Sequence, residues 1–137
     1  MWWIYALLSA FFAALTAILA KVGVRGINSD LATAIRTVFI LLIAWGIVLF
    51  GRQLNGNTHL TRTNLFFLGF SGIATGLSWI FYFKALQLGK VSQVAPVDKA
   101  SVAIAIILSA LFLHEALTAK IIIGALLIIA GTVVIIF

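Results

Sequence analysis

Residues 31–50 read LATAIRTVFILLIAWGIVLF, a run of 20 positions in which Arg36 is the one charged residue. A helix needs roughly 20 apolar residues to cross a hydrocarbon core of about 30 Å, and further apolar runs of similar length fill most of the chain. The five runs are Trp2–Ala20, Leu31–Phe50, Asn64–Phe83, Val91–Leu113 and Ile121–Phe137. Transmembrane strands would be about 10 residues long and alternate in polarity. The sequence therefore predicts an all-α integral membrane protein, a five-transmembrane-helix bundle forming one domain over residues 1–137.

Composition excludes several classes of function. The 137 residues are 64% hydrophobic and 9% charged, whereas about a quarter of the residues of globular proteins are charged. The absence of cysteine excludes disulfides and thiolate chemistry, and His59 and His114 are too sparse for a metal cage. No nucleophile with its base, phosphate-binding glycine loop or pair of hydrolytic carboxylates is present. We expect neither an enzyme nor a bound metal or cofactor.

The polar breaks carry turn and capping residues. Asn28-Ser29-Asp30 offers side-chain oxygens for an N-cap of the second span. Asn55-Gly56-Asn57 marks a turn in the second loop, and Gly89 is placed to end the third helix. The first run lacks a basic n-region and is longer than a typical signal-peptide core, so we expect it to be a retained span.

Basic residues are scattered singly through the breaks, which favours anchoring against lipid headgroups over nucleic-acid binding, although the net charge is +6. The first and third loops lie on one side of the membrane and the second and fourth on the other. Their basic residues are Lys21, Arg25, Lys84 and Lys90 against Arg52, Arg62 and Lys120. This weak excess favours a cytoplasmic location for the first and third loops, and it permits insertion in both orientations.

Charges within spans are rare and usually face a bundle interior or a wet cavity. Arg36 lies about 9 Å along its helix from Asp30, and Asp98 and Lys99 lie about 11–12 Å along theirs from Val91. Both helices enter from the same side, so the three charges can reach similar depth if the helices are neighbours.

Trp79 and Tyr82 end the third helix on that same side. We therefore expect a substrate cavity of net positive character, in which Arg36 and Lys99 donate to an anionic or zwitterionic solute. Asp98 would pair with Arg36 or bind a proton or an amine, and Trp79 and Tyr82 would stack on the solute. The alternative is that Arg36 and Lys99 snorkel to the interface and the aromatics form an interfacial belt.

Two other residues are candidates for the transport cycle. Pro96 removes a backbone hydrogen bond inside the fourth span, and broken helices accompany many transporter sites. A plain kink, or a first-turn proline of a later helix, is the alternative. Glu115, at the end of that span, is a candidate for proton or ion coupling together with Asp98.

Small residues recur at helical spacing, notably Gly69, Gly72 and Gly76 on one face of the third run. Small residues let helix backbones approach closely in lipid. This pattern is explained by packing within the bundle, and a dimer face is the alternative.

The last two spans resemble the EamA family of the drug/metabolite transporter superfamily. The residues that carry the resemblance are Ala95-Pro96-Val97-Asp98-Lys99-Ala100-Ser101, then Leu111-Phe112-Leu113-His114-Glu115, then Gly124-Ala125-Leu126-Leu127-Ile128-Ile129-Ala130-Gly131. Ala34-Ile35-Arg36 is similar to the family's Ala-x-Arg in its second helix. The likeness covers essentially the whole chain, and five spans equal one EamA repeat.

The resemblance implies a transporter of small metabolites such as amino acids or nucleotide-sugars, working by exchange or proton coupling. Most members resemble a fused pair of repeats with opposite orientations, so a single repeat implies a homodimer, with an antiparallel arrangement permitted. Family positions carried over are Arg36, Pro96, Asp98, Lys99 and Glu115. We place the protein in the cytoplasmic (inner) membrane of a bacterium or archaeon, with membrane lipid and a small-molecule substrate as its partners.

Three functions are compatible with these residues. The first is a metabolite carrier that works by alternating access. The second is a flippase of lipid-linked phosphates, with the cationic half-cavity on the phosphate. The third is a non-transporting membrane subunit that binds another protein through helix faces rich in glycine.

Overall fold

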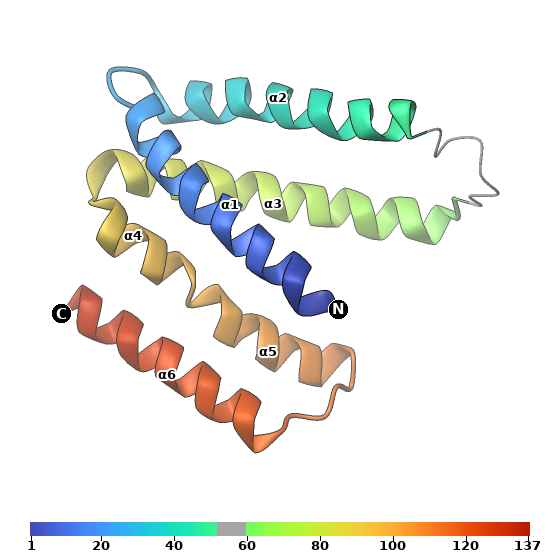
Figure 1. Cartoon of the computed structure of the whole chain (residues 1–137), viewed down its shortest axis with the longest axis vertical. Helices are drawn as coiled ribbons and strands as arrows, with labels where there is room; N and C mark the ends of the chain where they lie inside the picture. Colours follow the sequence, from blue (N-terminus) through green and yellow to red (C-terminus); the bar gives the residue numbers. More distant parts are fainter. Residues whose placement is uncertain (52–59) are drawn as a thin grey trace. The chain divides into compact units, whose positions relative to one another are not determined.

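The computed structural model describes residues 1–51 and 60–137, and the predicted turn at Asn55-Gly56-Asn57 lies outside them, as do Arg52 and His59. Helices account for most of the described residues, and no strand occurs among them. In chain order (Figure 1) the helices are α1 (Trp2–Gly23), α2 (Ser29–Phe50), α3 (Arg62–Leu88), α4 (Val91–Asp98), α5 (Ser101–Phe112) and α6 (Ala119–Ile136). Five segments are long and apolar enough to span a membrane, and Val91–Phe112, which holds α4 and α5, counts as one of them. The predicted all-α class with five spans is confirmed.

Helix α3 extends beyond the apolar run that ends at Phe83. Lys84 to Leu88 continue it because Lys, Ala, Leu and Gln are good helix formers, and the helix ends directly before Gly89. Its 27 residues exceed what a perpendicular span needs. Lys84, which the hydropathy pattern placed in the third break, therefore belongs to α3.

Contacts between Cα atoms divide the chain into two compact units. We call residues 19–87 the α2–α3 unit and residues 1–18 together with 88–137 the α4–α6 unit. Helix α1 contributes to both. Each unit is described by itself.

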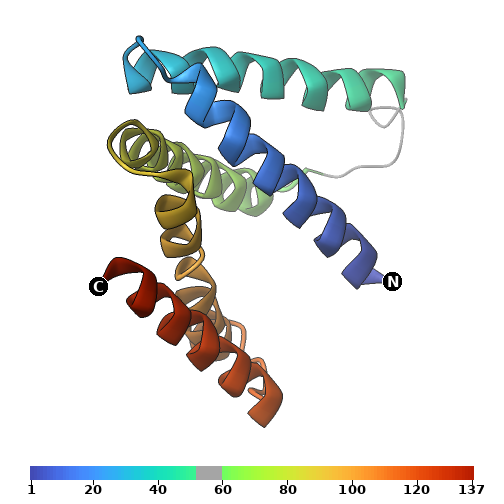
Figure 2. The ribbon, with the colours of Figure 1, turned by 60° about the vertical axis from the view of Figure 1, so that its left-hand side comes forward.

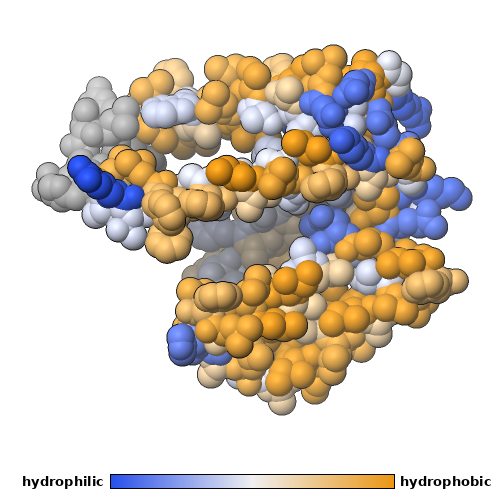
Figure 3. Space-filling view, turned by 180° about the vertical axis from the view of Figure 1, so that it is seen from behind, coloured by the Kyte–Doolittle hydropathy of each residue, from blue (hydrophilic) through white to orange (hydrophobic). Residues whose placement is uncertain are grey.

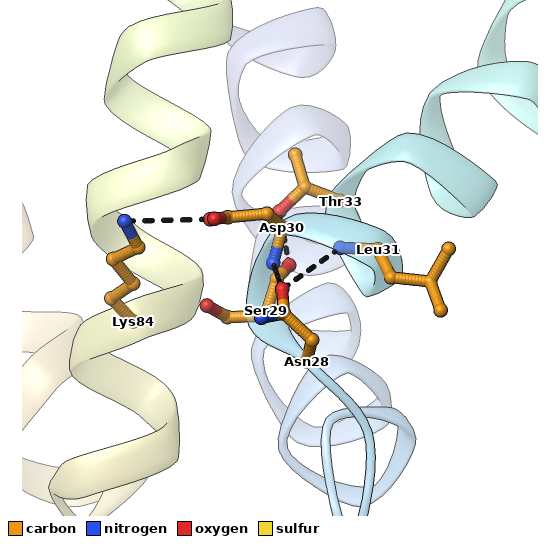
Figure 4. A network of polar contacts seen from close by, with 6 residues as sticks. All are labelled: Asn28, Ser29, Asp30, Leu31, Thr33 and Lys84. Atoms are coloured by element: carbon orange, nitrogen blue, oxygen red, sulfur yellow. Dashed lines mark hydrogen bonds and ion pairs between the residues drawn. The ribbon is translucent and has the colours of Figure 1, made fainter.

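In the α2–α3 unit, the turn between α1 and α2 is built by capping and by a left-handed residue. Gly26 has a φ of 76°, a conformation that glycine adopts without steric cost. Asn28 is the N-cap of α2, and its Oδ1 accepts hydrogen bonds from the N–H groups of Asp30 (2.7 Å) and Leu31 (3.3 Å) (Figure 4). The predicted cap is confirmed, and it fixes the point at which α2 starts.

The same turn is tied to the end of α3. Gln87 Nε2 donates to the carbonyl of Ile27 at 2.6 Å, and Lys21 Nζ donates to the carbonyl of Leu86. The side chains of Val24 and Leu86 are buried beneath these bonds. These contacts hold α2 and α3 in register, and the two helices run in opposite directions (Figures 1 and 2).

In the α4–α6 unit, α4 and α5 both pack against α6 (Figure 2). Thr118 is the N-cap of α6 and accepts from the N–H of Ile121. Ala103 and Thr132 are the buried residues of α5 and α6.

Most of each span is apolar and accessible. Between 0 and 11% of the most apolar stretch of each span is buried, and hydrophobic residues cover most of the face in Figure 3. In water such a surface would drive aggregation, whereas lipid tails or other transmembrane helices cover it without cost.

Candidate functional site

Arg36 is the charged residue of α2 that lies well inside its span. It follows Ser29 by two helical turns, which places it about 10 Å along the helix axis. The side chain is half-buried. Its Cζ lies 4.3 Å from the ring centroid of Trp79 and 5.4 Å from that of Phe83. Both rings come from α3, so Arg36 bridges the two helices of its unit through cation–π contacts.

The aromatic partners of Arg36 share one face of α3. Trp79, Tyr82 and Phe83 stand at positions i, i+3 and i+4, which are neighbours on a helix surface. Tyr82 interacts electrostatically with Arg36, and its ring centroid lies 6.4 Å from that of Phe83. The structure therefore places Arg36, Trp79 and Tyr82 beside one another, and we call them, with Phe83, the Arg36 site.

Phe83 was missed at the level of sequence. It is almost fully buried, with 2% of its surface exposed, and it supplies the second ring beside Arg36. Its spacing of four residues from Trp79 was the available signal, because an aromatic residue one turn from a candidate binding aromatic lies on the same face.

Within the α2–α3 unit, no described carboxylate pairs with the guanidinium of Arg36, because Asp30 pairs with Lys84. The two ion pairs in residues 1–51 and 60–137 join Lys84 to Asp30 and Lys99 to Asp98, each at 3.5 Å. A cation–π contact is worth about 0.5–2 kcal/mol and uses the electrostatic field of the guanidinium without consuming its N–H donors. Those donors are available to an anionic ligand.

The pair between Asp30 and Lys84 closes the end of the α2–α3 unit next to the Asn28 cap (Figure 4). Half of the Lys84 side chain and 55% of the Asp30 side chain are exposed. Ion pairs with that much solvent access contribute about 0–1 kcal/mol. The pair thus sets local charge balance more than it stabilises the fold.

Asp98 and Lys99 belong to the α4–α6 unit, where Lys99 Nζ lies 3.5 Å from Asp98 Oδ2. Asp98 is the last residue of α4 and Lys99 is its C-cap. The pair neutralises itself within its own segment. Its meeting with Arg36 stays a prediction.

The fourth span is interrupted at Lys99 and Ala100, between α4 and α5, and Pro96 lies inside α4 in the turn before the interruption. Pro96 has no N–H, so the carbonyl one turn earlier loses its helical donor. Between α4 and α5 the backbone hydrogen bonds join residues three apart, as in a 3₁₀ turn, instead of four apart. The N–H of Ala100 donates to the carbonyl of Val97 (3.0 Å), and the N–H of Val102 donates to that of Lys99 (3.0 Å). Polar backbone at membrane depth is tolerated where protein surrounds it.

Thr132 of α6 supplies part of that protein environment. Its Oγ1 lies 2.8 Å from the carbonyl of Ile128 and 3.4 Å from that of Pro96, and the residue is buried. The hydroxyl therefore sits between its own helix and the interrupted one. A lone hydroxyl after Gly131 in an otherwise apolar run was the signal for this residue, and the sequence reasoning passed over it.

Glu115 lies exposed in the segment between α5 and α6. Within the described part of the chain no ion pair engages it, and Thr118 provides the cap of the next helix. Within the α4–α6 unit, Asp98 pairs with Lys99 and no described ion pair joins Glu115 to either residue.

Five helices long and apolar enough to cross a membrane define an integral membrane protein. Comparison with known families agrees, because the model of the EamA-like transporter family matches residues 1–137. The chain belongs to the EamA-like transporter family, and thereby to the drug/metabolite transporter superfamily. It is a membrane transporter.

A relative from Sinorhizobium sp is described as "Uncharacterized transporter in cobO 3'region". It is 48% identical over 130 residues, which cover 95% of this chain and 92% of the relative. No solved structure matches the chain.

Proposed function

We propose that this transporter carries small metabolites with an anionic group, amino-acid-like or otherwise anionic or zwitterionic, by alternating access. The observation that carries the proposal is the Arg36 site, in which a guanidinium inside a span lies over Trp79 and Phe83 and pairs with no described carboxylate of its own unit. A charge inside a membrane is costly and persists where it serves a substrate or ion pathway. A solute anion supplies the missing counter-charge.

The proposal includes the interrupted fourth span as the moving part. Discontinuous helices occur where transporters bind their solutes and rock between two states. Asp98 and Glu115 are the candidates for coupling transport to a proton or ion. The bacterial source of the Sinorhizobium relative supports a location in the bacterial cytoplasmic membrane.

The replacement of Trp79 by leucine tests this function. We expect uptake of the transported solute to fall about tenfold, because a desolvated cation–π contact worth about 1–2 kcal/mol positions Arg36. The assay is counterflow in proteoliposomes, with labelled amino acids and other small anions screened against empty vesicles. Trp45→Leu is the matched control, since Trp45 lies on α2 with 53% of its surface exposed.

Two results would contradict the proposal. One is exchange of no labelled small anion above the level of empty vesicles. The other is an equal loss in the Trp79 and Trp45 variants, because a site role for Trp79 requires the first to lose much more than the second.

We further propose that the protein works as a homodimer with its two copies antiparallel. The Sinorhizobium relative has little sequence beyond the matched segment, so it too has the length of one five-span repeat. On α3, a Cβ added at Gly69, Gly72 or Gly76 would meet nothing within 4 Å among the described residues, which leaves this face open to a second copy. Helix association in lipid favours such small-residue faces.

Cysteine labelling tests the antiparallel dimer, and the chain has no native cysteine to interfere. Arg25→Cys and Lys120→Cys place thiols in the first break and at the start of α6, which the topology puts on opposite membrane sides. We expect an impermeant reagent added from one side to label both variants partially. Complete labelling of one variant and none of the other would show a single orientation and exclude the antiparallel arrangement.

A further inference from the structure

The charges inside the spans leave one positive charge without compensation. Lys84 pairs with Asp30 and Lys99 pairs with Asp98, and each of these pairs lies within one unit. Lys21 donates to the carbonyl of Leu86 near the end of α1. The remaining basic residues of the described helices, Arg62 and Lys120, stand in the first turns of α3 and α6. Among the described residues, the other charges at depth thus have partners within their own units, and Arg36 has none within its unit.

From this balance we infer that Arg36 binds a single carboxylate, so that the solute presents one planar, singly charged group to the site. The inference rests on the proposed function and names the chemical class of its substrate. One positive charge in a medium of low dielectric compensates one negative charge. A second negative charge would be buried without a partner, which costs several kcal/mol.

The shape of the site agrees with a carboxylate. The rings of Trp79 and Phe83 engage the guanidinium by cation–π contact, and the N–H donors remain for the ligand. A guanidinium forms two parallel N–H···O bonds with a planar carboxylate, whereas an ammonium acts as a point charge. The guanidinium of Arg36, stacked on these rings, is thus suited to bind a planar carboxylate through two parallel hydrogen bonds.

The same balance disfavours a phosphate monoester. Such a group carries about −1.5 to −2 charges near neutral pH and would need a second cation. Lys84 and Lys99 are also cations, but Lys84 already pairs with Asp30 and Lys99 with Asp98. A lipid that ends in a phosphate monoester is therefore a poorer ligand than a small carboxylate.

Three matched probes distinguish these ligands. Benzoate is a planar monoanion, benzamide is its neutral counterpart of similar shape, and phenyl phosphate carries the higher charge. The fluorescence of Trp79 reports binding when the other three tryptophans are replaced by phenylalanine (Trp2→Phe, Trp3→Phe, Trp45→Phe). The shift in melting temperature of the unmodified chain in detergent gives a second measurement that does not depend on these replacements.

We expect benzoate to bind about tenfold to a hundredfold more tightly than benzamide, as charge-assisted bidentate bonds do, and more tightly than phenyl phosphate. Arg36→Gln should abolish the difference, and Arg36→Lys should retain only part of it. If phenyl phosphate binds as tightly as benzoate and both depend on Arg36, the carboxylate inference is wrong and the proposed function stands. If no probe discriminates, the inference is also wrong, and the proposed function falls with it only if uptake is indifferent to Arg36.

Discussion

Replacement of Arg36 with glutamine is expected to lower uptake about a hundredfold or more, the largest loss that any single substitution in the chain should cause. The change removes the charge and the guanidinium fork while it keeps a polar side chain of similar reach. Truncating one partner of a desolvated, hydrogen-bonded charge pair costs about 2–5 kcal/mol, and every 1.4 kcal/mol is a factor of ten. Counterflow in proteoliposomes measures the loss.

Arg36→Lys separates the two properties of the residue. Lysine keeps the positive charge but loses the planar fork and much of the stacking on Trp79. We therefore expect its uptake to lie between those of the parent chain and the glutamine variant. Arg25→Gln is the matched control because Arg25 lies exposed in the turn between α1 and α2. Uptake by the glutamine variant at the level of this control would remove Arg36 from the site and place it among residues that only anchor the helix.

Replacement of Pro96 with alanine should raise stability and slow transport at the same time. Alanine restores the missing N–H and removes the clash of the proline ring, a change worth about 3 kcal/mol in a helix interior. We expect an increase of about 1–3 kcal/mol in the free energy of unfolding in detergent. Uptake should fall about tenfold or more if the interruption between α4 and α5 moves during the cycle.

Pro96→Gly is the control for this experiment. Glycine also restores the N–H but has a helix propensity about 1 kcal/mol below that of alanine, so it should stiffen the helix less than alanine does. We expect the glycine variant to transport much better than the alanine variant. Equal transport by the two variants and the parent would show that the interruption is static.

The sequence predicted the elements of this protein better than their ends. Leu31 to Phe50 is long and apolar enough to permit only a membrane helix, and the cap at Asn28 follows from the hydrogen-bonding of its side chain. The extension of α3 to Leu88 was not evident from hydropathy, because Lys84 and Gln87 look like loop residues when only polarity is considered. Lysine, alanine, leucine and glutamine are good helix formers, so the helix continues through them, and the hydrogen bond of Gln87 to Ile27 ties this end of α3 to the turn before α2.

The candidate site was predictable in part. Arg36 stood out because a charge inside a span is costly in free energy. Trp79 and Tyr82 followed because they lie toward the same side of the membrane. Phe83 and Thr132 were not predicted, because a phenylalanine or a threonine costs little free energy inside an apolar span and so does not stand out in the sequence. Their roles depend on which atoms of other helices lie beside them.

What the sequence determined by itself is the environment of the chain. Five apolar runs can satisfy their backbone in lipid only as helices, and that constraint holds before any tertiary contact forms. What only the tertiary structure decided is the partner of each polar group, with Arg36 over Trp79 and Phe83, Lys84 on Asp30, and Thr132 beside the interrupted helix at Pro96. Lipid does not distinguish one apolar helix face from another, so these pairings arise from close packing and short-range electrostatics between helices.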